Sequence, residues 1–490
     1  LQEVFREKNR KTVLTGSILA IVICGGLLAW MYSFKNIKPD HKVTAGVIGF
    51  LAVYLILFAV GTSVKKMYRI FPAAVLLVLI CELFVLDYPS LWHRESPTRN
   101  QVATEYYNDG TKEAVAMLKE QDDSVYRIEK SYTSASENDG MSQSYNGLSV
   151  YMSTNPASLV AYHKMYGPET LSGNFVDFNM DDYIRSSLLG TKYLITGTGY
   201  HAPQKIYTSV GEAGGRSVFE NQYALPFGYL YDKEWNQEEV KEMSGLDKTL
   251  ASLSGFYYTD AEETSSYQKA DLPEQTDLSL LDYADTATDC TMEKGSEGIT
   301  VSNLGADPNV VFPGVASCFA DNDKLYGLSL TVDAPDETEM AVYYQTEGDE
   351  GFSAEKVYTF KVTEDNRTWE HLVPGGITEL RVDVSSPVES AVINNFELKS
   401  CDITESGYTA LKESGVDEVT FSDSTYQAQV TNDASENKML CVPLFYQKGW
   451  TAQIDGEDAG VYNINEGMCG VEVPSGTHEI VLKYETPYKN

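Results

Sequence analysis

Three long apolar segments near the amino terminus constrain this chain more than any other feature of its sequence. Two of them, Val13 to Ser33 and Val43 to Val64, carry no charged side chain. As helices they would be about 31 and 33 Å long, close to the roughly 30 Å hydrocarbon core of a bilayer. The third, Ile70 to Leu86, carries one acid, Glu82. We predict three transmembrane helices, at residues 13–33, 43–64 and 70–86, in a membrane part covering residues 1–90.

Basic residues that flank these segments favour one orientation. Short loops rich in Lys and Arg tend to stay in the cytoplasm. Seven basic residues lie on the side of the amino terminus and five on the opposite side. The first group is Arg6, Lys8, Arg10, Lys11, Lys65, Lys66 and Arg69, and the second is Lys35, Lys38, Lys42, Arg94 and Arg99. We expect a cytoplasmic amino terminus and an exterior carboxy-terminal part.

The remainder of the chain is strongly acidic. The whole sequence has 37 basic and 71 acidic residues and a net charge of −34. Residues 1–87 hold ten basic and five acidic side chains, so residues 88–490 hold 27 and 66, a net −39. Binding to nucleic acid requires a basic surface, so no nucleic-acid partner is expected. A hydrophobic content of 43% also excludes wholesale disorder.

Residues 91–258 show alternating helix and strand patterns, which predict an α/β (α+β) domain. Residues 111–120 and 181–189 have helical periodicity, and residues 124–129 and 192–196 are typical of strands. A further helix is expected over residues 237–254, broken near Gly245. The order helix, Gly190, strand fits a glycine that ends a helix.

Beyond this domain the apolar period becomes two. Residues 259–288 are acidic and turn-rich and are interpreted as a linker. Residues 289–405 are predicted to form a β-sandwich, and residues 406–490 a second, small β-sandwich. Hairpin turns are expected at Asp455-Gly456 and at Ser475-Gly476-Thr477. The predicted fold class is therefore a multidomain membrane protein with three transmembrane α-helices, an exterior α/β (α+β) domain and one or two antiparallel β-sandwiches.

One ionisable residue lies inside a predicted span, and this makes it a candidate for function. A carboxyl group in hydrocarbon costs about 2.5–3.5 kcal/mol, so Glu82 requires an explanation. It is either protonated or snorkelling near the interface, hydrogen-bonds a neighbouring helix, or faces a site for a lipid phosphate or acceptor. In the last case Asp87, His93 and Arg94, just outside the membrane, would join it.

Other candidate sites have weaker signals. Trp450 could stack on a sugar ring, although an anchoring role in the last sandwich, beside Gly449, fits better. Seven cysteines at irregular spacing give no disulfide framework, although Cys441 and Cys469 could form one bridge. No zinc-binding, Walker A, nucleophile-elbow or dinucleotide motif is present in the sequence, so no metal is predicted and any cofactor is unknown.

Several short phrases follow one another in an order that resembles the carboxy-terminal half of the YfhO family of bacterial membrane proteins. No single phrase is specific, but their order together with the preceding apolar spans is. The phrases are Arg127 in VYRIE, Tyr145-Asn146-Gly147, Tyr151-Met152-Ser153, Leu188 to Leu194, Phe219-Glu220-Asn221, Ala224-Leu225-Pro226, Pro443, Gly449-Trp450, Asp455-Gly456 and Gly476-Thr477-His478.

The resemblance implies a GT-C-type glycosyltransferase in a bacterial plasma membrane. Such an enzyme transfers a sugar from a polyprenyl-phosphate carrier to a cell-surface glycopolymer acceptor such as lipoteichoic acid. Its base is usually an acid in the first exterior loop of the complete protein, and no segment here matches that loop. The chain begins at Leu1, so we expect the catalytic half to be missing. The alternative is a non-catalytic, membrane-anchored carbohydrate-binding or structural surface protein.

Overall fold

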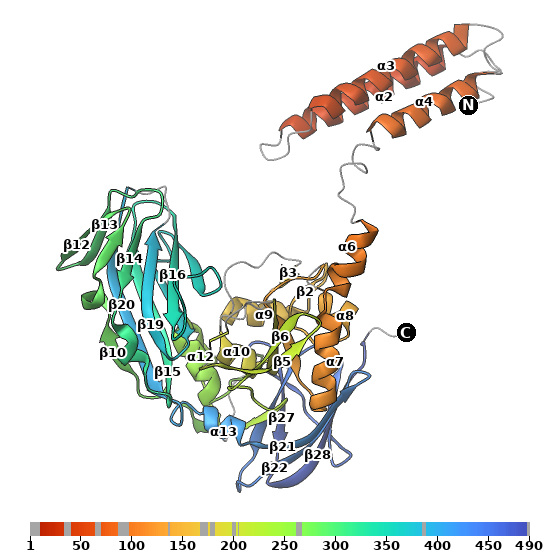
Figure 1. Ribbon diagram of the computed structural model, residues 1–490. Coiled ribbons are helices and arrows are strands. Elements are labelled where there is room, and N and C mark those ends of the chain that lie inside the picture. Colours follow the sequence, from red (N-terminus) through yellow and green to blue (C-terminus); the bar gives the residue numbers. More distant parts are fainter. Residues whose placement is uncertain are drawn as a thin grey trace. The chain divides into compact units, whose positions relative to one another are not determined.

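The computed structural model describes residues 10–33, 41–63, 70–86, 98–135, 138–166, 175–176, 182–197, 202–203, 205–260, 267–384 and 389–487. The chain divides into two compact units, Leu1–Gln101 and Val102–Asn490. The first is helical and the second is rich in β-strands (Figure 1). This mixed, multidomain architecture agrees with the predicted fold class at that level. The finer boundaries at residues 258 and 405 stay a prediction.

Three apolar helices form where the sequence predicts them. They are α2 (Arg10–Ser33), α3 (His41–Ser63) and α4 (Phe71–Leu86). Among the described helices, the stretch His41–Gly61 is the one long and apolar enough to cross a membrane. The apolar stretches Ile18–Leu27 and Phe71–Leu86 are shorter. The prediction of three membrane spans is therefore supported for one helix and stays a prediction for the other two.

The second unit begins with a sheet of four strands in the order β1-β4-β6-β5. Strand β1 pairs with β4 in parallel, and the other pairs are antiparallel. Helix α7 (Thr111–Gln121) packs its apolar residues on this sheet, with Val115 and Leu118 against Ile128 and Val218. The strands are β1 (Arg127–Lys130), β4 (Thr191–Thr196), β5 (Tyr207–Ala213) and β6 (Arg216–Asn221).

Short elements surround this sheet and agree with the predicted α/β character. Helix α10 (Tyr183–Leu188) is followed by Leu189 and Gly190, and the φ of +79° at Gly190 is the left-handed conformation expected after a helix. The predicted helix at 237–254 is divided into α11 (Gln237–Glu242) and α12 (Gly245–Ser254). The other elements are α6 (Arg99–Thr104), η2 (Tyr106–Asn108), α8 (Asp139–Gln143), β2 (Val150–Tyr151), α9 (Ala157–Tyr166), β3 (Phe175–Val176), β8 (Lys233–Glu234) and β9 (Gln268–Lys269).

The first β-sandwich consists of two sheets that share one core. One sheet has the order β12-β13-β20-β15-β18, with β10 also paired to β20, and the other has the order β11-β14-β19-β16-β17. The strands are β10 (Thr276–Ser279), β11 (Thr286–Thr288), β12 (Thr291–Gly295), β13 (Gly298–Ser302), β14 (Asn309–Phe312), β15 (Lys324–Asp333), β16 (Thr338–Thr346), β17 (Val357–Val362), β18 (Thr368–Val373), β19 (Ile377–Val384) and β20 (Ser390–Asp402). Short 3-10 helices η3 (Leu281–Tyr283) and η4 (Val315–Phe319) lie between them.

Part of the segment interpreted as a linker belongs to this sandwich. Strand β10 pairs with β20, and β11 pairs with β14, so residues 276–279 and 286–288 are built into its two sheets. The interpretation of residues 259–288 as a linker is corrected here. These strands were not predicted because β10 is an exposed edge strand with no buried face, so its sequence lacks the alternation of apolar and polar residues that indicates a strand.

The second β-sandwich also has two sheets, β21-β22-β28-β24-β25 and β26-β27-β23-β7. Strand β7 (Tyr229–Tyr231) comes from the preceding α/β segment and pairs with β23. The other elements are α13 (Tyr408–Lys412), β21 (Gly415–Ser422), β22 (Thr425–Asn432), β23 (Lys438–Phe445), β24 (Trp450–Ile454), β25 (Glu457–Ala459), β26 (Tyr462–Ile464), β27 (Met468–Val473) and β28 (Gly476–Tyr484).

One of the two predicted hairpin turns is present. Asp455 and Gly456 have φ values of +51° and +86° and connect β24 to its antiparallel partner β25. The turn at Ser475-Gly476-Thr477 is not a hairpin, because β27 and β28 belong to different sheets. Gly476 lies where the chain crosses from one sheet of the sandwich to the other. A turn residue is required at such a crossing as well as in a hairpin, so the two cannot be distinguished from the sequence.

The possible disulfide between Cys441 and Cys469 is absent, and all seven cysteines are free. Strands β23 and β27 are neighbours, as predicted, but Cys469 pairs with Val442 rather than with Cys441. A shift of one residue places two side chains on opposite faces of a sheet. Cys441 accordingly lies in the core around α10, and Cys469 lies inside the sandwich.

A buried network of charges ties α7, β1 and α8 together. Lys130 Nζ lies 2.7 Å from Asp139 Oδ2, and the side chains are only 5% and 4% exposed. Arg216 lies 3.1 Å from Asp109 and stacks over Tyr132 at 3.9 Å. Because both ion pairs are shielded from water, each carboxylate requires its cation.

We expect Lys130→Met to destabilise the second unit by about 3 kcal/mol, because it leaves the buried Asp139 carboxylate without a counter-charge. Urea unfolding of the purified protein measures this loss. The matched control is Lys361→Met, since Lys361 is 57% exposed and pairs with Glu337 at 3.4 Å. That exposed pair should contribute less than about 1 kcal/mol. Equal losses in both variants would contradict the structural role of the buried network.

The turn beside β28 provides a pH-dependent interaction. His478 Nδ1 lies 2.7 Å from Asp455 Oδ2, and this hydrogen bond raises the pKa of His478. The interaction therefore stabilises the fold fully below the unfolded pKa of about 6.5 and is lost as pH rises through the higher folded value. We expect His478→Gln to lower Tm at pH 5.5 and to have no effect at pH 9. In an Asp455→Asn background the substitution should show no such pH dependence, and a difference that persists there would refute the pairing.

Candidate functional site

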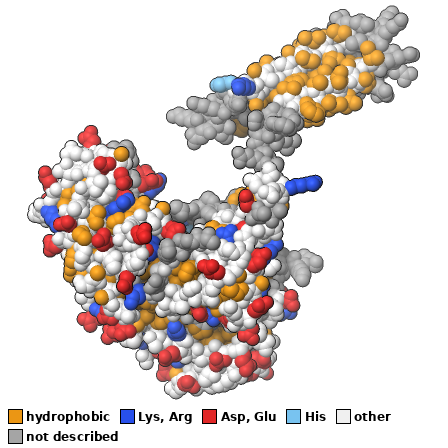
Figure 2. Space-filling model, viewed as in Figure 1, with side chains coloured by type: hydrophobic (Ala, Val, Ile, Leu, Met, Phe, Trp, Pro, Cys, Tyr) orange, Lys and Arg blue, Asp and Glu red, His pale blue; other side chains and the backbone are white. Residues whose placement is uncertain are grey.

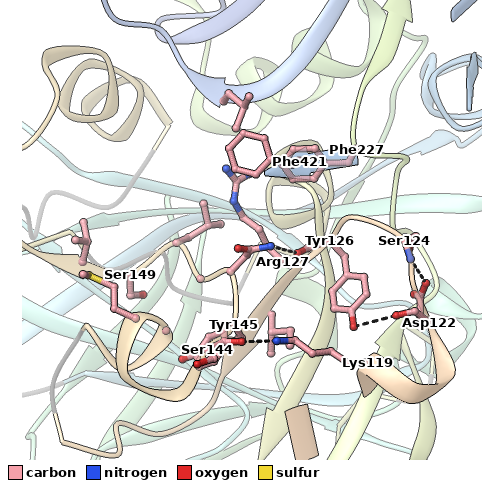
Figure 3. A pocket seen from close by; sticks show the side chains of 18 of the residues that line it. Lys119, Asp122, Ser124, Tyr126, Arg127, Ser144, Tyr145, Ser149, Phe227 and Phe421 are labelled. Carbon is pink, nitrogen blue, oxygen red and sulfur yellow. Dashed lines mark hydrogen bonds between the residues drawn. The ribbon is translucent and has the colours of Figure 1, made fainter. Parts of the chain in front are cut away.

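A cleft of about 660 Å³ opens between β1, α8 and the edge of the second sandwich. Its walls combine aromatic rings with side chains and backbone groups that can form hydrogen bonds, as Figure 3 shows. The rings belong to Tyr126, Tyr145, Phe227 and Phe421. Residues of the second unit alone line it.

The back wall is the free edge of strand β1. On its other side β1 pairs with β4, so its outer edge faces the loop that follows α8. Asn146 O accepts a hydrogen bond from Ile128 N at 2.8 Å, and Asn146 Nδ2 donates to Tyr126 O at 3.3 Å. The loop carrying Tyr145-Asn146-Gly147 is therefore held against β1 by the backbone oxygen and the side-chain amide of Asn146. Lys119 Nζ donates to Ser144 O at 2.7 Å and fixes the loop from the side of α7.

Arg127 lies at the start of β1 and is only 8% exposed. Its guanidinium donates to Leu189 O, at the end of α10, and lies 5.0 Å from the centroid of the Phe227 ring. Its backbone N donates to Gly190 O at 2.8 Å. Burial lowers the pKa of Arg127 to about 10, opposed by the negative charge of Glu129, so the side chain is still a cation at neutral pH.

The acid at the opposite end of the cleft is already paired. Asp122 Oδ2 accepts hydrogen bonds from Lys192 and Tyr193, each at 2.7 Å. Burial alone would raise the pKa of Asp122, but these bonds and those from Ser124 lower it well below its ordinary value. A carboxylate held ionised in this way is a poor proton acceptor. Asp122 is thus suited to positioning and not to general-base catalysis.

The two tyrosines of the cleft stay protonated. Burial, followed by the charge of Asp122, raises the pKa of Tyr126 to about 12. Burial also raises the pKa of Tyr145 above its ordinary value. Their hydroxyls are therefore neutral hydrogen-bonding groups at physiological pH. Rings with polar tips, next to backbone amides and a cation, are suited to binding a saccharide or polyol by stacking and hydrogen bonds.

No cluster of three His, Cys, Asp or Glu side chains that could hold a metal ion occurs in the described parts of the chain.

Of the residues proposed from the sequence, the structure describes Glu82 and Trp450, and neither is among the residues that line the cleft. Glu82, on α4, accepts a hydrogen bond from Tyr54 of α3 at 2.7 Å, which is the helix-to-helix contact considered among its possible roles. Asp87, His93 and Arg94 lie outside the described residues, so their grouping with Glu82 stays a prediction.

Trp450 is half-buried in the second sandwich. Its Nε1 donates to Phe445 O at 3.2 Å, and its ring lies 5.4 Å from that of Tyr484. These contacts support the anchoring role. Its role in stacking on sugar stays an untested alternative.

Sequence reasoning did not single out the cleft, but the phrases behind the family resemblance converge on it. Arg127, Asn146 and Gly190 come from three of those phrases. Arg127 N donates to Gly190 O, and Asn146 forms hydrogen bonds with Tyr126 and Ile128, the two chain neighbours of Arg127. Phe227 follows a fourth phrase, Ala224-Leu225-Pro226, and its ring contacts the position of Gly190. No sequence feature indicated that Phe421 lines a cleft, because nothing in the pattern around it distinguishes it from other exposed residues of a strand.

Comparison with known proteins identifies the family. Residues 1–490 match the family described as bacterial membrane protein YfhO. The chain belongs to the YfhO family. It is 22% identical over 511 residues to the uncharacterized protein YfhO of Bacillus subtilis (strain 168), an alignment that covers 98% of this chain and 55% of that protein. The chain thus spans about half the length of this YfhO relative.

Solved structures give more distant similarities. The arabinofuranosyltransferase AftD from Mycobacteria aligns with 99% of this YfhO-family chain and 73% of its own, at 8% identity and a TM-score of 0.35. The carbohydrate-binding module CBM6 of LamC from Zobellia galactanivorans aligns in full with 26% of this chain, at 13% identity and a TM-score of 0.17. At these scores neither similarity carries an argument about function.

Substitution of Gly190 tests how closely the Phe227 ring packs against the end of α10. A Cβ added there would lie 2.7 Å from the Phe227 ring, in addition to the strain of a φ of +79°. Gly215, with a φ of +73° and open space around its Cβ position, isolates the strain alone. We expect Gly215→Ala to cost about 1 kcal/mol and Gly190→Ala to cost more, because Phe227 must move. Thermal unfolding measures both, and equal losses would mean that Phe227 is not fixed against Gly190.

Proposed function

We propose that this chain is the carboxy-terminal part of a YfhO-family membrane glycosyltransferase, and that its cleft holds the acceptor glycan. The donor in this proposal is a sugar linked to polyprenyl phosphate, and the acceptor is a cell-surface glycopolymer such as lipoteichoic acid. The observation that carries the proposal is the combination of four aromatic rings with hydrogen-bonding groups around a 660 Å³ cleft. Membership of a family of bacterial membrane proteins supports the location at a membrane.

The proposal divides the work between this chain and the rest of the protein. Helices α2, α3 and α4 would help to hold the lipid carrier in the plasma membrane, in a multi-pass arrangement with the second unit outside the cell. The apolar composition of α3 supports this placement. The resemblance to the YfhO family implies that the catalytic base lies in a loop outside this chain, and the paired Asp122 of the cleft does not suit that role.

A membrane-anchored glycan-binding protein without catalysis is the second candidate. The observation that Asp122 does not suit the role of a base favours this candidate, and the glycan would bind in the same cleft. The two candidates differ in one measurable respect, which is whether altering the cleft changes sugar transfer or only binding. In both, an aromatic ring at the rim of the cleft should stabilise the bound glycan by burying apolar area.

Phe421 is the most direct test of glycan binding in the cleft, because it is 37% exposed and lines the rim. We expect Phe421→Ala to reduce transfer of labelled sugar onto the surface polymer of intact bacteria about tenfold, which corresponds to roughly 1.4 kcal/mol of lost contact. Membrane levels of the protein are measured in parallel by immunoblot.

Phe352→Ala is the matched control. Phe352 is a half-buried ring of the first sandwich that packs near Arg381 and lies outside the lining of the cleft. Transfer should be unchanged in this variant. Unchanged transfer in Phe421→Ala with reduced glycan binding would favour the non-catalytic candidate. Unchanged transfer and unchanged binding would refute the assignment of the cleft.

A further inference from the structure

The second unit exposes few large apolar side chains, and most of them belong to its first elements. In the described part of this unit, the large apolar side chains that are 37% exposed or more are Val102, Met141, Tyr151, Met152, Leu278 and Phe421. The first four belong to α6, to α8 and to the end of β2. Single exposed apolar residues are ordinary on a protein surface, but a group of them marks a surface that contacts a partner. These four residues are called the apolar patch below.

Hydrogen bonds hold the elements of the apolar patch together. Asn138, directly before α8, donates from Nδ2 to Tyr151 O at 2.9 Å and accepts at Oδ1 from Tyr151 N at 3.0 Å. Met141 follows within α8 and is 83% exposed. Asn108 of η2 donates to Val102 O in α6 at 2.7 Å, and η2 contacts α8. Figure 1 accordingly shows α6, α8 and β2 at the same end of the second unit.

Acidic residues are sparse around the apolar patch. Residues 88–490 hold 66 acids among 403 positions, and Figure 2 shows acidic side chains over both sandwiches on the face in view. Residues 138–166 hold one acid, Asp139, which is buried and paired with Lys130. Helix α6 has one charged side chain, the exposed Arg99. A bilayer with anionic lipids would therefore repel the acidic sandwiches but not this end of the unit.

The covalent chain keeps this end of the unit within reach of a membrane. The stretch His41–Gly61 of α3 is long and apolar enough to cross a bilayer. The end of α4 packs beside the start of this stretch, since a Cβ added at Gly46 would lie 2.8 Å from Leu86 Cδ2. Twelve residues separate Leu86 from Arg99, the first residue of α6. A fully extended chain of that length covers about 45 Å, which limits how far α6 can lie from the end of α4.

We propose that the apolar patch lies in the interfacial layer of a lipid bilayer, where Met141, Tyr151 and Met152 contact the headgroups and the upper part of the acyl chains. The unbranched Met side chain adapts to irregular lipid packing, and a Tyr ring buries its body while its hydroxyl stays hydrated. Arg99 would contact the phosphates of anionic headgroups. This contact does not require that the cleft holds a glycan. Because Met141 also lines the cleft, the mouth of the cleft would open beside the membrane surface.

Photo-crosslinking to lipid tests this surface on the full chain. The protein is placed in nanodiscs of phosphatidylglycerol and phosphatidylethanolamine that contain a phosphatidylglycerol with a diazirine in its acyl chain, and mass spectrometry locates the adducts. Yields are normalised to those of a water-soluble diazirine. We expect peptides containing Met141 or Tyr151 to show about ten times the yield of the peptide containing Leu278. Leu278 is a matched comparison, because it is 41% exposed on the first sandwich, and equal yields would overturn the proposal.

Substitution then assigns the contact to the apolar side chains themselves. In the triple variant Met141→Ser, Tyr151→Ser and Met152→Ser, lipid adducts on the rest of residues 138–153 should fall about fivefold, because the segment loses the apolar area that holds it in the interface. Leu278→Ser should leave these adducts unchanged. All four side chains are exposed, so both variants should keep the Tm of the unaltered protein in detergent. Unchanged adducts in the triple variant would overturn the role of the apolar patch.

A second copy of the chain is the other occupant that this experiment can reveal. In that case light scattering in detergent would find a dimer for the unaltered protein and a monomer for the triple variant, and residues 138–153 would carry no lipid adducts in nanodiscs. That result would overturn the membrane contact and leave the glycan cleft untouched. Adducts confined to α2, α3 and α4 would overturn it as well. If the triple variant fails to fold, the comparison of Met141 with Leu278 in the unaltered protein still decides the question.

Discussion

One buried cation determines the geometry of the cleft. The Arg127 guanidinium reaches the end of α10 through Leu189 and stacks against Phe227, while its backbone bonds to Gly190. Phe227 in turn leads into β7, which pairs with β23 of the second sandwich. A charge withdrawn from water must be compensated by its surroundings. The α/β sheet and the second sandwich are therefore connected through the residues that surround this side chain.

This connection explains why binding groups from distant parts of the sequence meet. Tyr126 and Tyr145 belong to the α/β segment, and Phe421 belongs to the second sandwich. The loop at Asn146 is held on the free edge of β1 and cannot be displaced without breaking two hydrogen bonds. A preorganised wall of this kind lowers the entropic cost of binding a flexible polymer.

Periodicity and turn residues in the sequence predicted local elements well, but not their pairing. Asp455-Gly456 gave a correct hairpin because both residues accept positive φ, whereas Gly476 gave the same signal at a crossing between sheets. Between β21 and β22 the turn is formed by Asp423 and Ser424, whose φ values are +48° and +62°, without the glycine that gave the signal at Asp455-Gly456. The pairing of β7 with β23 joins residues some 200 positions apart, and no local pattern encodes such a contact. For the same reason the sequence placed Arg127 and Tyr145 in recognisable phrases without revealing that they border one cleft.

Whether a glycan occupies this cleft can be measured directly by hydrogen–deuterium exchange of the full chain in nanodiscs, with and without fragments of the surface polymer of the bacterium. Bound glycan should slow exchange in residues 119–128 and 138–150, and leave the first sandwich unaffected. Protection confined to the first sandwich, or to the region around Trp450, would place the glycan elsewhere and contradict the role assigned to the cleft.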